Sequence, residues 1–458
     1  MSESETKGLK RLKSGALERR VSIARAGLVA GSRLMAKTAF SIFTDKAQRS
    51  ERQRQHFERE AKYLVRELGK LKGSAVKVGQ MLALYGEHFL PRALTDALHT
   101  LEDQTTAMEW SVVEAELKQQ LGTSQYRRLR IDRHPLAAAS LGQVHTAVDK
   151  ENGQQWCLKI QYPGVAEAID GDLDSVARLL RLSRIVSPGV DFDDWIEEVR
   201  NMLHREVDYR EEANQTDLFR QRVSRDRRFV VPEVNQALST GKLLVTSFES
   251  GVSVSTLATG ELSQSARNAL GRSFLELFMR EVFEWGAMQT DPNFGNYRIR
   301  PAQRRGAYDK LVLLDFGAVQ PFPDSFLNPF REMIRGAYKQ DLEQVRQGAL
   351  GLHFIRPEYP ESAQWSFTRL CASVIEPLIA TPATAAAHLF NKEGQYRWLH
   401  SDLPSRVAKE AVAAVMDRNF KVPAKEFMFL NRKLIGVYTF ISALGSEFNG
   451  TDIIERYL

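Results

Sequence analysis

The sequence predicts an α+β fold in which a helical N-terminal region is followed by a small antiparallel sheet and a mostly helical C-terminal half. Apolar residues recur at spacings of three and four through much of residues 51–125, which is the period of an amphipathic helix. Two β-type runs joined by a polar turn follow Gly122, and helical patterns dominate from Asp324 onward. Strands and helices do not alternate along the chain, which excludes a doubly wound parallel sheet.

The region before the sheet divides into a leader, residues 1–50, and a helical extension, residues 51–125. Within the extension we expect a long helix over 51–85. Pro91 then opens a second helix, because proline suits the first helical turn. A third helix is expected over 110–121.

Residues 126–250 are expected to hold the antiparallel sheet and an inserted helical segment. Runs rich in β-branched and aromatic residues predict strands at 144–148, 156–160, 229–234 and 242–248. Helical patterns fill 165–223, with a break near Ser187. The remaining domain, residues 251–458, begins with an apolar helix over 266–286.

Composition places the chain among ordinary globular proteins, with 43% hydrophobic and 26% charged residues. Cys157 and Cys371 lie far apart and share no ligand spacing with histidine, so a disulfide framework and a zinc site are not expected. No apolar run reaches the roughly 18 residues of a membrane-spanning helix, and no signal peptide is apparent. We therefore expect a cytoplasmic protein, with peripheral contact at the inner membrane as the alternative.

Positive charge is concentrated in the first 60 residues, which hold 14 Lys or Arg and 7 Asp or Glu. The net charge of that segment is therefore +7. Because the net charge of the whole chain is +6, the remaining residues carry a net charge of −1. A helix predicted over 17–43 could rest on an anionic membrane surface. A solvated tail explains the charge equally well. Nucleic acid is not expected as a partner, because the body of the chain is close to neutral.

Three separate motifs carry candidate chemistry. The first is an alanine-rich turn that fits the protein-kinase nucleotide loop G-x-G-x-x-G-x-V, with Ala137 and Ala139 at the first two glycine positions and Gly142 and Val144 at later ones. Lys159 follows on the next expected strand, where kinases place the lysine that binds the α- and β-phosphates. Taken alone, the segment is more typical of an ordinary turn.

The second motif follows the apolar helix, where Asp291 and Asn296 have the D-x-x-x-x-N spacing of the kinase catalytic loop. In kinases this Asp orients the phosphate acceptor and the Asn binds a metal ion. The third is Asp315-Phe316-Gly317 at the end of a short apolar strand, where a carboxylate can coordinate Mg²⁺. Each is a common turn sequence by itself, but their order together predicts a protein-kinase-like two-lobe fold.

Over about residues 60–320 the chain resembles the UbiB/AarF/ADCK family of atypical protein-kinase-like proteins. The resemblance is carried by Lys77-Val78-Gly79-Gln80, by the alanine-rich loop Ala137-Ala138-Ala139-Ser140, by Glu206-Val207-Asp208-Tyr209 with Glu212, and by Gln289–Asn296. The Gln-Thr-Asp-Pro-Asn wording is similar to that of the coenzyme Q-associated ADCK branch.

The resemblance implies a role for each matching residue, with ATP and Mg²⁺ as cofactors. Asp291, Lys159 and Glu212 are the implied catalytic residues, and Asn296 and Asp315 the implied metal ligands. The implied nucleotide-binding set is Ala137, Ala138, Ala139, Ser140, Gly142, Val144 and Lys159. Lys77, Gln80, Glu206 and Asp208 are implied to join a regulatory helical extension to the nucleotide-binding lobe, with Lys77 reaching the two acidic residues.

The chain departs from ordinary protein kinases in ways that bear on its substrate. No His-Arg precedes Asp291, and Pro321 and Pro323 follow Gly317 so closely that little room remains for a peptide-docking segment. The resemblance implies Mg-dependent ATP hydrolysis or phosphorylation of a small molecule, in support of isoprenoid-quinone (ubiquinone) biosynthesis or lipid handling. A lipid or quinone precursor is then the implied ligand. A protein kinase acting in trans and a nucleotide-gated scaffold (a pseudokinase) remain alternatives, and the sequence does not give the oligomeric state.

Overall fold

The structure is a computed structural model that describes residues 59, 62, 65, 74–86, 92–100, 107–139, 141–182, 192–254, 262–302, 304, 308–403, 406 and 425–458. The chain divides into two compact units. Unit 1 comprises the chain up to Asn214 together with Glu233–Phe248, and unit 2 comprises Gln215–Pro232 together with Glu249–Leu458. The basic leader, the helix predicted over 17–43, most of the helix predicted over 51–85, and Ser140 lie outside the described residues.

Unit 1 contains the predicted antiparallel sheet, in the strand order β1-β3-β4-β6 with β2 paired to β3. Its strands are β1 (Leu129–Ile131), β2 (Ala137–Ala138), β3 (Gly142–Asp149), β4 (Gln155–Gln161) and β6 (Leu243–Ser247). The antiparallel pairing of β3 with β4 confirms the predicted strand, turn and strand. Gly153 lies in the turn with a φ of 75°, a conformation that glycine adopts at low cost. Leu158 and Ile160 of β4 are almost completely buried, which anchors the sheet in the core of unit 1.

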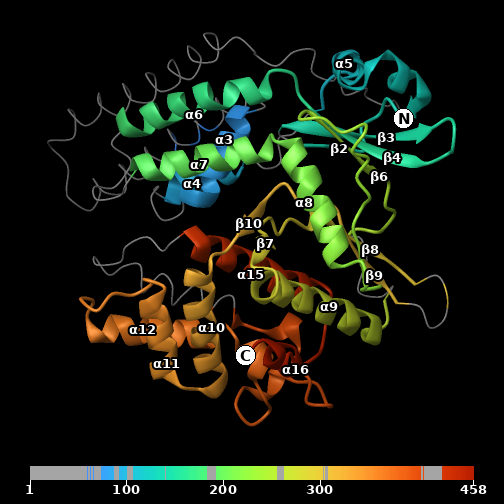
Figure 1. Ribbon diagram of the computed structural model, residues 1–458. Helices are drawn as coiled ribbons and strands as arrows, with labels where there is room; N and C mark the ends of the chain where they lie inside the picture. The colour runs from blue at the N-terminus through green and yellow to red at the C-terminus, as the bar shows by residue number, and fades with distance from the viewer. Residues whose placement is uncertain are drawn as a thin grey trace. The chain divides into compact units, whose positions relative to one another are not determined.

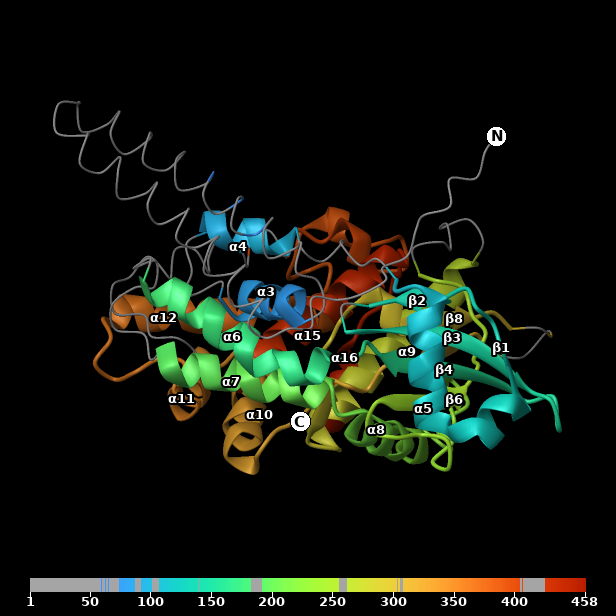
Figure 2. The same ribbon diagram turned by 90° about the horizontal axis from the view of Figure 1, so that it is seen from above.

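Helix α5 (Trp110–Arg128) lies across this sheet and contacts β1 and β4 (Figure 2). Val113, Leu117 and Leu121 form its buried stripe, at the spacing of four that one helical face requires. The expected helix over 110–121 is confirmed, and the chain then continues helically beyond a kink at Gly122, whose φ is 72°. Only glycine adopts that conformation at low cost.

Unit 1 contains further helices, labelled in Figure 1. They are α3 (Ser74–Gly86), α4 (Arg92–His99), α6 (Val165–Leu182), α7 (Phe192–Glu206) and the first turns of α8 (Tyr209–Arg222). α3 packs against α4, α6 and α7 through Val76, Val78 and Leu82, each at most 2% exposed. The predicted second helix near Pro91 is therefore confirmed as α4.

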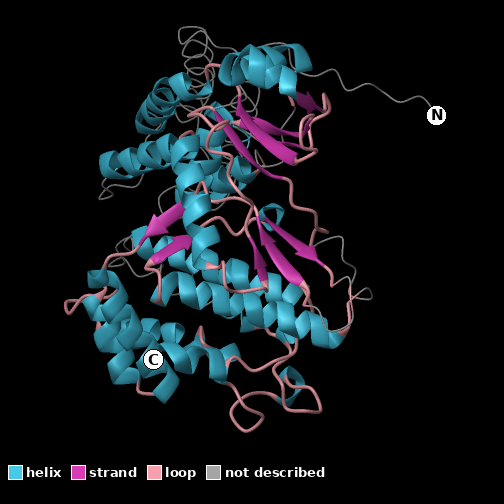
Figure 3. Ribbon diagram, turned by 45° about the vertical axis from the view of Figure 1, so that its right-hand side comes forward, coloured by secondary structure: helices cyan, strands magenta, loops and turns pink. Residues whose placement is uncertain are grey.

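Unit 2 contains two small sheets beside its helices (Figure 3). One joins β5 (Phe229–Val230), β9 (Lys310–Leu313) and β8 (Tyr297–Arg300), and the other joins β7 (Ala287–Gln289) and β10 (Val319–Pro321). The strand expected over 229–234 is shorter than predicted. Its first residues pair with β9 in unit 2, while Val234 forms a bridge with Thr246 in unit 1. Pro232 cannot donate a ladder hydrogen bond, and it lies between the two pairings.

The helices of unit 2 confirm a mostly helical C-terminal half. They are α9 (Gln264–Phe283), α10 (Asp324–Lys339), α11 (Leu342–Gly351), α12 (Glu361–Ser373), α13 (Glu376–Ile379), α15 (Lys425–Ala443) and α16 (Thr451–Ile454). α9 begins at Ser263, whose hydroxyl oxygen accepts a hydrogen bond from the Ala266 amide as an N-cap. Among the described residues, no helix combines the length and apolar character that crossing a membrane requires.

Helices α10 and α11 approach so closely that Gly348 has no space for a side chain. A Cβ atom there would lie 2.8 Å from the Met333 backbone nitrogen and 2.9 Å from its Cα atom. We expect Gly348→Ala to destabilise the protein by about 1–3 kcal/mol despite alanine's higher helix propensity, because the obstructing atoms belong to a helix backbone. The midpoint of denaturant-induced unfolding measures this effect.

Gly241→Ala is the matched control, because no atom lies within 4 Å of a Cβ at that position. Its unfolding midpoint should stay close to that of the parent protein. Equal stability of the two variants would contradict the close α10–α11 approach.

Candidate functional site

The best-defined polar contact in unit 1 joins Lys159 of β4 to Glu212 of α8. The Lys159 Nζ atom lies 2.6 and 2.8 Å from the two carboxylate oxygens of Glu212. The Glu212 side chain is only 3% exposed, whereas the Lys159 side chain is 25% exposed. The Tyr209 ring lies 5.2 Å from the same ammonium group, at cation–π distance. A lysine held in this way offers a fixed, partly accessible positive charge.

The alanine-rich segment forms a tight turn at the start of the hairpin. Ala137 and Ala138 pair with Val144 and Gln143 of β3, and the Ala139 amide donates to the Gly142 carbonyl oxygen. The backbone is therefore fixed close to β3.

Gly142 sits at the tightest point of this turn. A Cβ atom at Gly142 would lie 2.4 Å from the Ile160 carbonyl oxygen and 3.0 Å from the Tyr209 hydroxyl oxygen. Gly142 is thus required by its neighbours. Val144 is the register partner of Lys159, so both side chains lie on the same face of the hairpin.

The Lys-x-Gly-Gln motif lies on α3, with Lys77 and Gln80 both half-buried. Lys77 forms an ion pair with Glu206 at the end of α7. Asp208 makes different contacts: its carboxylate accepts hydrogen bonds from the Arg210 and Glu211 amides and so caps the start of α8. The motif is therefore joined to the segment that leads directly into the Glu212 helix.

In unit 2 the two acidic loops are tied together at both ends by backbone hydrogen bonds. The Thr290 amide donates to the Ala318 carbonyl oxygen, next to the β7–β10 pair. The Leu314 amide donates to the Asn296 carbonyl oxygen, next to the β8–β9 pair. Because both ends are fixed, the loop from Thr290 to Asn296 lies alongside the loop from Leu314 to Ala318. Asp291, Asn296 and Asp315 therefore belong to one polar cluster.

Side-chain contacts orient the members of this cluster. The Asn296 Nδ2 group donates to Asp291 Oδ2 at 2.8 Å, and Arg432 Nη2 lies 3.0 Å from Asp291 Oδ1. The Gly317 amide donates to Asp315 Oδ1 at 2.9 Å. Phe316 is buried against the Phe219 ring of α8, with ring centroids 4.7 Å apart, so the Asp-Phe-Gly segment is anchored by its central side chain.

The donor set of the cluster suits Mg²⁺ in one respect. Asn296 and Asp315 supply an amide and a carboxylate oxygen, and Mg²⁺ is commonly held by one or two protein groups together with phosphate oxygens and water. No group of three or more His, Cys, Asp or Glu among the described residues could hold a metal ion alone. These residues therefore fit a metal ion that arrives with a phosphate ligand better than a resident one.

The buried ammonium group of Lys433 contacts residues on both sides of the Asp291–Asn296 loop. Lys433 of α15 is 1% exposed, and its Nζ atom lies 3.3 Å from Glu281 Oε2, 3.2 Å from Gln289 Oε1 and 3.1 Å from the Tyr297 hydroxyl oxygen. Burial raises the pKa of Glu281 to about 7, while Lys433 opposes that rise. Gln289 and Tyr297 flank the Asp291–Asn296 loop in sequence, so one ammonium group holds both of its ends.

Helix α15 also contacts the loop through small and aromatic groups. A Cβ atom at Gly436 would lie 2.1 Å from the Pro292 Cβ atom, so only glycine permits the observed packing. The Phe440 ring packs edge-on against the rings of Phe294 and Tyr297. Sequence reasoning missed this helix as part of the site. One signal was present, namely a lysine on the apolar stripe of Leu430, Val437 and Phe440, because a buried lysine requires a partner.

An antiparallel sheet carrying a Lys–Glu ion pair, together with a helical unit carrying an Asp–Asn loop beside an Asp-Phe-Gly turn, defines the protein-kinase-like class of fold. Residues 100–349 match the family model described as the ABC1 atypical kinase-like domain. The chain belongs to this family of atypical kinases, and the resemblance seen in the sequence is confirmed.

Relatives support the same assignment. The chain is 30% identical to the mitochondrial atypical kinase coq-8 of Caenorhabditis elegans over 84% of this chain and 49% of that protein. It is 29% identical to the mitochondrial atypical kinase COQ8 of Schizosaccharomyces pombe over 88% of this chain and 63% of that protein. The chain thus spans 49% and 63% of the length of these two relatives.

A solved structure with the same fold is that of Rv3197 from Mycobacterium tuberculosis, obtained as a complex with erythromycin. It has a TM-score of 0.60 and 24% sequence identity, and the match covers 90% of this chain and 98% of that one. At this level of identity the similarity establishes the fold, and the predicted kinase-like α+β class is confirmed.

The Lys433 network yields a pH-dependent prediction. In Lys433→Met the buried Glu281 carboxylate loses its cationic partner, which should cost about 3–5 kcal/mol. Glu281 has a folded pKa raised above its unfolded value of about 4.5, so its protonated form favours folding and its stabilising effect is lost as the pH rises through about 7. The deficit of Lys433→Met should therefore be larger at about pH 8 than at about pH 5.

Unfolding free energies of the parent and variant across this pH range test the prediction. The double variant Lys433→Met/Glu281→Gln removes both charges and should lose the pH dependence of the deficit. A deficit that is the same at all pH values would show that Lys433 acts by packing alone.

Proposed function

We propose that this protein binds Mg-ATP and uses it for hydrolysis or for phosphorylation of a small molecule. The observation that carries the proposal is the pair of loops in unit 2, joined at both ends, that gathers Asp291, Asn296 and Asp315. Membership of the atypical kinase family supports ATP as the nucleotide. The resemblance carried by the sequence motifs supports a role in isoprenoid-quinone biosynthesis or in lipid handling, and the coq-8 and COQ8 relatives are mitochondrial atypical kinases.

In this proposal each unit contributes its own groups. Lys159, oriented by Glu212, binds phosphate oxygens through its ammonium group, beside the β2–β3 pair that includes Ala137 and Gly142. Asn296 and Asp315 hold Mg²⁺, which neutralises charge on the phosphates when bound. Asp291 orients the attacking water or hydroxyl group and accepts its proton. Arg432 keeps the Asp291 carboxylate in place and adds positive charge next to it.

The segment after Gly317 supports a small acceptor rather than a polypeptide. The chain enters β10 at Val319 and helix α10 at Asp324, so no long segment follows the Asp-Phe-Gly turn. In ordinary kinases an activation loop lies at this position in the chain. With that loop missing, water, a lipid headgroup or a quinone precursor is the more reasonable acceptor.

The state of Asp291 favours a second candidate function, a scaffold that binds ATP without turning it over. Both carboxylate oxygens are already engaged, one by Asn296 and the other by Arg432. A carboxylate held at both oxygens can position a nucleotide complex without taking part in its turnover.

Phosphate release from Mg-ATP tests the proposal, measured with and without anionic liposomes and a quinone-precursor analogue. The parent protein should release phosphate, and Asp315→Asn should abolish that release and Mg-dependent ATP binding, because the amide removes the charged metal ligand. Glu393→Gln is the control, since it makes the same chemical change at an exposed position of unit 2.

The outcomes separate the candidates. Tight Mg-ATP binding without phosphate release under every condition would show that the protein is a nucleotide-binding scaffold rather than an enzyme. Full activity of Asp315→Asn would refute the metal assignment. Transfer of labelled phosphate to another protein, lost in Asp291→Asn, would indicate a protein kinase.

A substitution of Arg432 tests how this arginine acts on Asp291. If the protein turns over ATP, Arg432→Gln should lower the rate of phosphate release by at least about tenfold with little change in ATP affinity, because the arginine positions Asp291 during the reaction. Arg346→Gln is the matched control, since Arg346 forms a similar ion pair with Glu343 elsewhere in unit 2. An increase in rate in Arg432→Gln would mean that the arginine restrains Asp291 rather than assisting it.

A further inference from the structure

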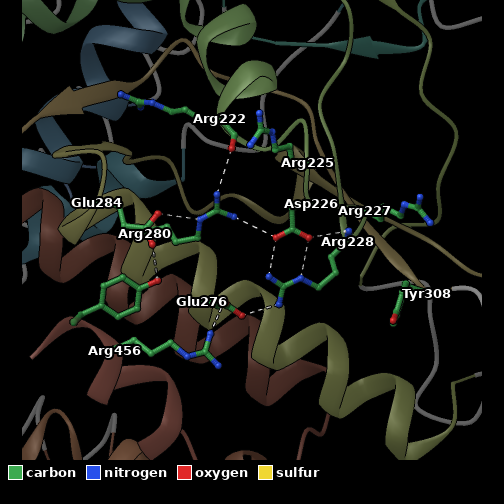
Figure 4. Close-up of a pocket in the computed structure, with 11 residues that line it drawn as sticks. Arg222, Arg225, Asp226, Arg227, Arg228, Glu276, Arg280, Glu284, Tyr308 and Arg456 are labelled. Carbon is green, nitrogen blue, oxygen red and sulfur yellow. Dashed lines mark hydrogen bonds and ion pairs between the residues drawn. The ribbon is translucent and has the colours of Figure 1, made fainter.

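Unit 2 contains an arginine-rich pocket whose lining includes no residue of the proposed nucleotide site (Figure 4). It has a volume of about 690 Å³ and is formed by the turn after α8, one face of α9, and the C-terminal segment. Its lining residues are Arg222, Arg225, Asp226, Arg227, Arg228, Glu276, Arg280, Glu284, Tyr308, Arg456 and Tyr457. A cavity of this size is in the range that holds small ligands.

The inner wall of the pocket is an ordered network of ion pairs. Asp226 accepts from Arg228 at 2.7 Å and lies 3.2 Å from Arg280. Glu276 lies 2.6 Å from Arg228 and 2.9 Å from Arg456. Burial favours the neutral form of Asp226, but the hydrogen bonds from Arg228 and the charges of Arg228 and Arg280 hold its pKa below the usual range. The carboxylate therefore stays ionised.

Arg222, the sixth arginine of the pocket, forms no ion pair with the three carboxylates that line it. The Arg222 guanidinium group lies over the Phe219 and Trp285 rings, and Arg222 faces the network only through its carbonyl oxygen, which accepts from Arg280. Five guanidinium groups therefore share the pocket with three carboxylates, which leaves a surplus of two positive charges.

The surplus resides on Arg225 and Arg227, which flank Asp226 in the chain. Both are exposed, and no carboxylate of the described residues pairs with either one. Figure 4 shows Arg225 above the ion-pair network and Arg227 to one side of it, the same side as Tyr308. Tyr308 is 64% exposed, so its hydroxyl group is free to reach a ligand at the rim.

We infer that this pocket binds a compact anion carrying two or more phosphate groups, either as a soluble molecule or as a lipid headgroup. Guanidinium groups bind phosphate oxygens in a two-pronged geometry, and a pocket with surplus charge concentrates anions at its mouth. The ion-paired arginines form a rigid floor for one phosphate, while Arg225 and Arg227 close over another. The site is separate from the proposed ATP function and is independent of it.

Binding of inositol hexakisphosphate, measured by calorimetry in the absence of Mg²⁺, tests the soluble form of the ligand. Arg225→Gln/Arg227→Gln should weaken this binding by about tenfold or more, because both unpaired charges are lost. Arg356→Gln/Arg369→Gln is the control, since it removes two exposed arginines from unit 2 outside the pocket. Its affinity should stay within about threefold of the parent.

Flotation with phosphatidylcholine vesicles, with and without phosphatidylinositol 4,5-bisphosphate, tests the lipid source. Binding of both probes, lost in the pocket variant alone, would show that the phosphates suffice. Vesicle binding alone, lost in the same variant, would identify a lipid headgroup. Equal losses in pocket and control variants, displacement of the anion by ATP, or no binding of either probe to the parent would overturn the inference.

Discussion

The ammonium group of Lys433 is the interaction on which the polar cluster of unit 2 depends. It is buried among Glu281, Gln289 and Tyr297, which come from a helix and from the two strands that flank the Asp291 loop. Removing a charge from water is costly unless several groups compensate it, and here three groups do so at once. The cost of leaving any of them unpaired fixes the helix and both strands relative to one another.

That constraint explains how a loop rich in proline, asparagine and glycine can hold a defined shape. Proline, asparagine and glycine favour turns, and here the Asn293 side chain accepts a hydrogen bond from the Gly295 amide at the start of the short 3-10 turn Phe294–Asn296. In this protein both ends are tied to the neighbouring acidic loop, and the middle is pressed against α15 at Pro292. The loop therefore holds Asp291 and Asn296 in one arrangement.

Much of the fold could be predicted because it depends on local patterns. The β3–β4 hairpin, the long apolar helix α9 and the helical C-terminal half follow from apolar periodicity and turn residues. The Lys159–Glu212 pairing followed from the family resemblance, and the structure brings those two side chains together. The shape of the turn at Ala137 was less predictable, since it depends on the pairing of β2 with β3.

The features that could not be predicted from the sequence depend on contacts between distant segments. The separation of Phe229 from Val234 into different units reflects which strand each one meets, and no local pattern encodes that choice. The same holds for Arg432, because an arginine at the surface of a helix is usually solvated and nothing nearby in sequence indicates a partner. The arginines around Asp226 were visible as a run of charge, but the Glu276 carboxylate that pairs with Arg228 comes from the distant helix α9.

The contact between Gly436 and Pro292 has a consequence for how this protein can change over evolution. The pyrrolidine ring occupies the space that a side chain on α15 would need, so the two positions share one fixed volume. Neither can grow unless the other shrinks, although they are far apart in the chain. Sequences of this family should therefore show correlated sizes at these two positions, with the glycine inherited together with the ring that it accommodates.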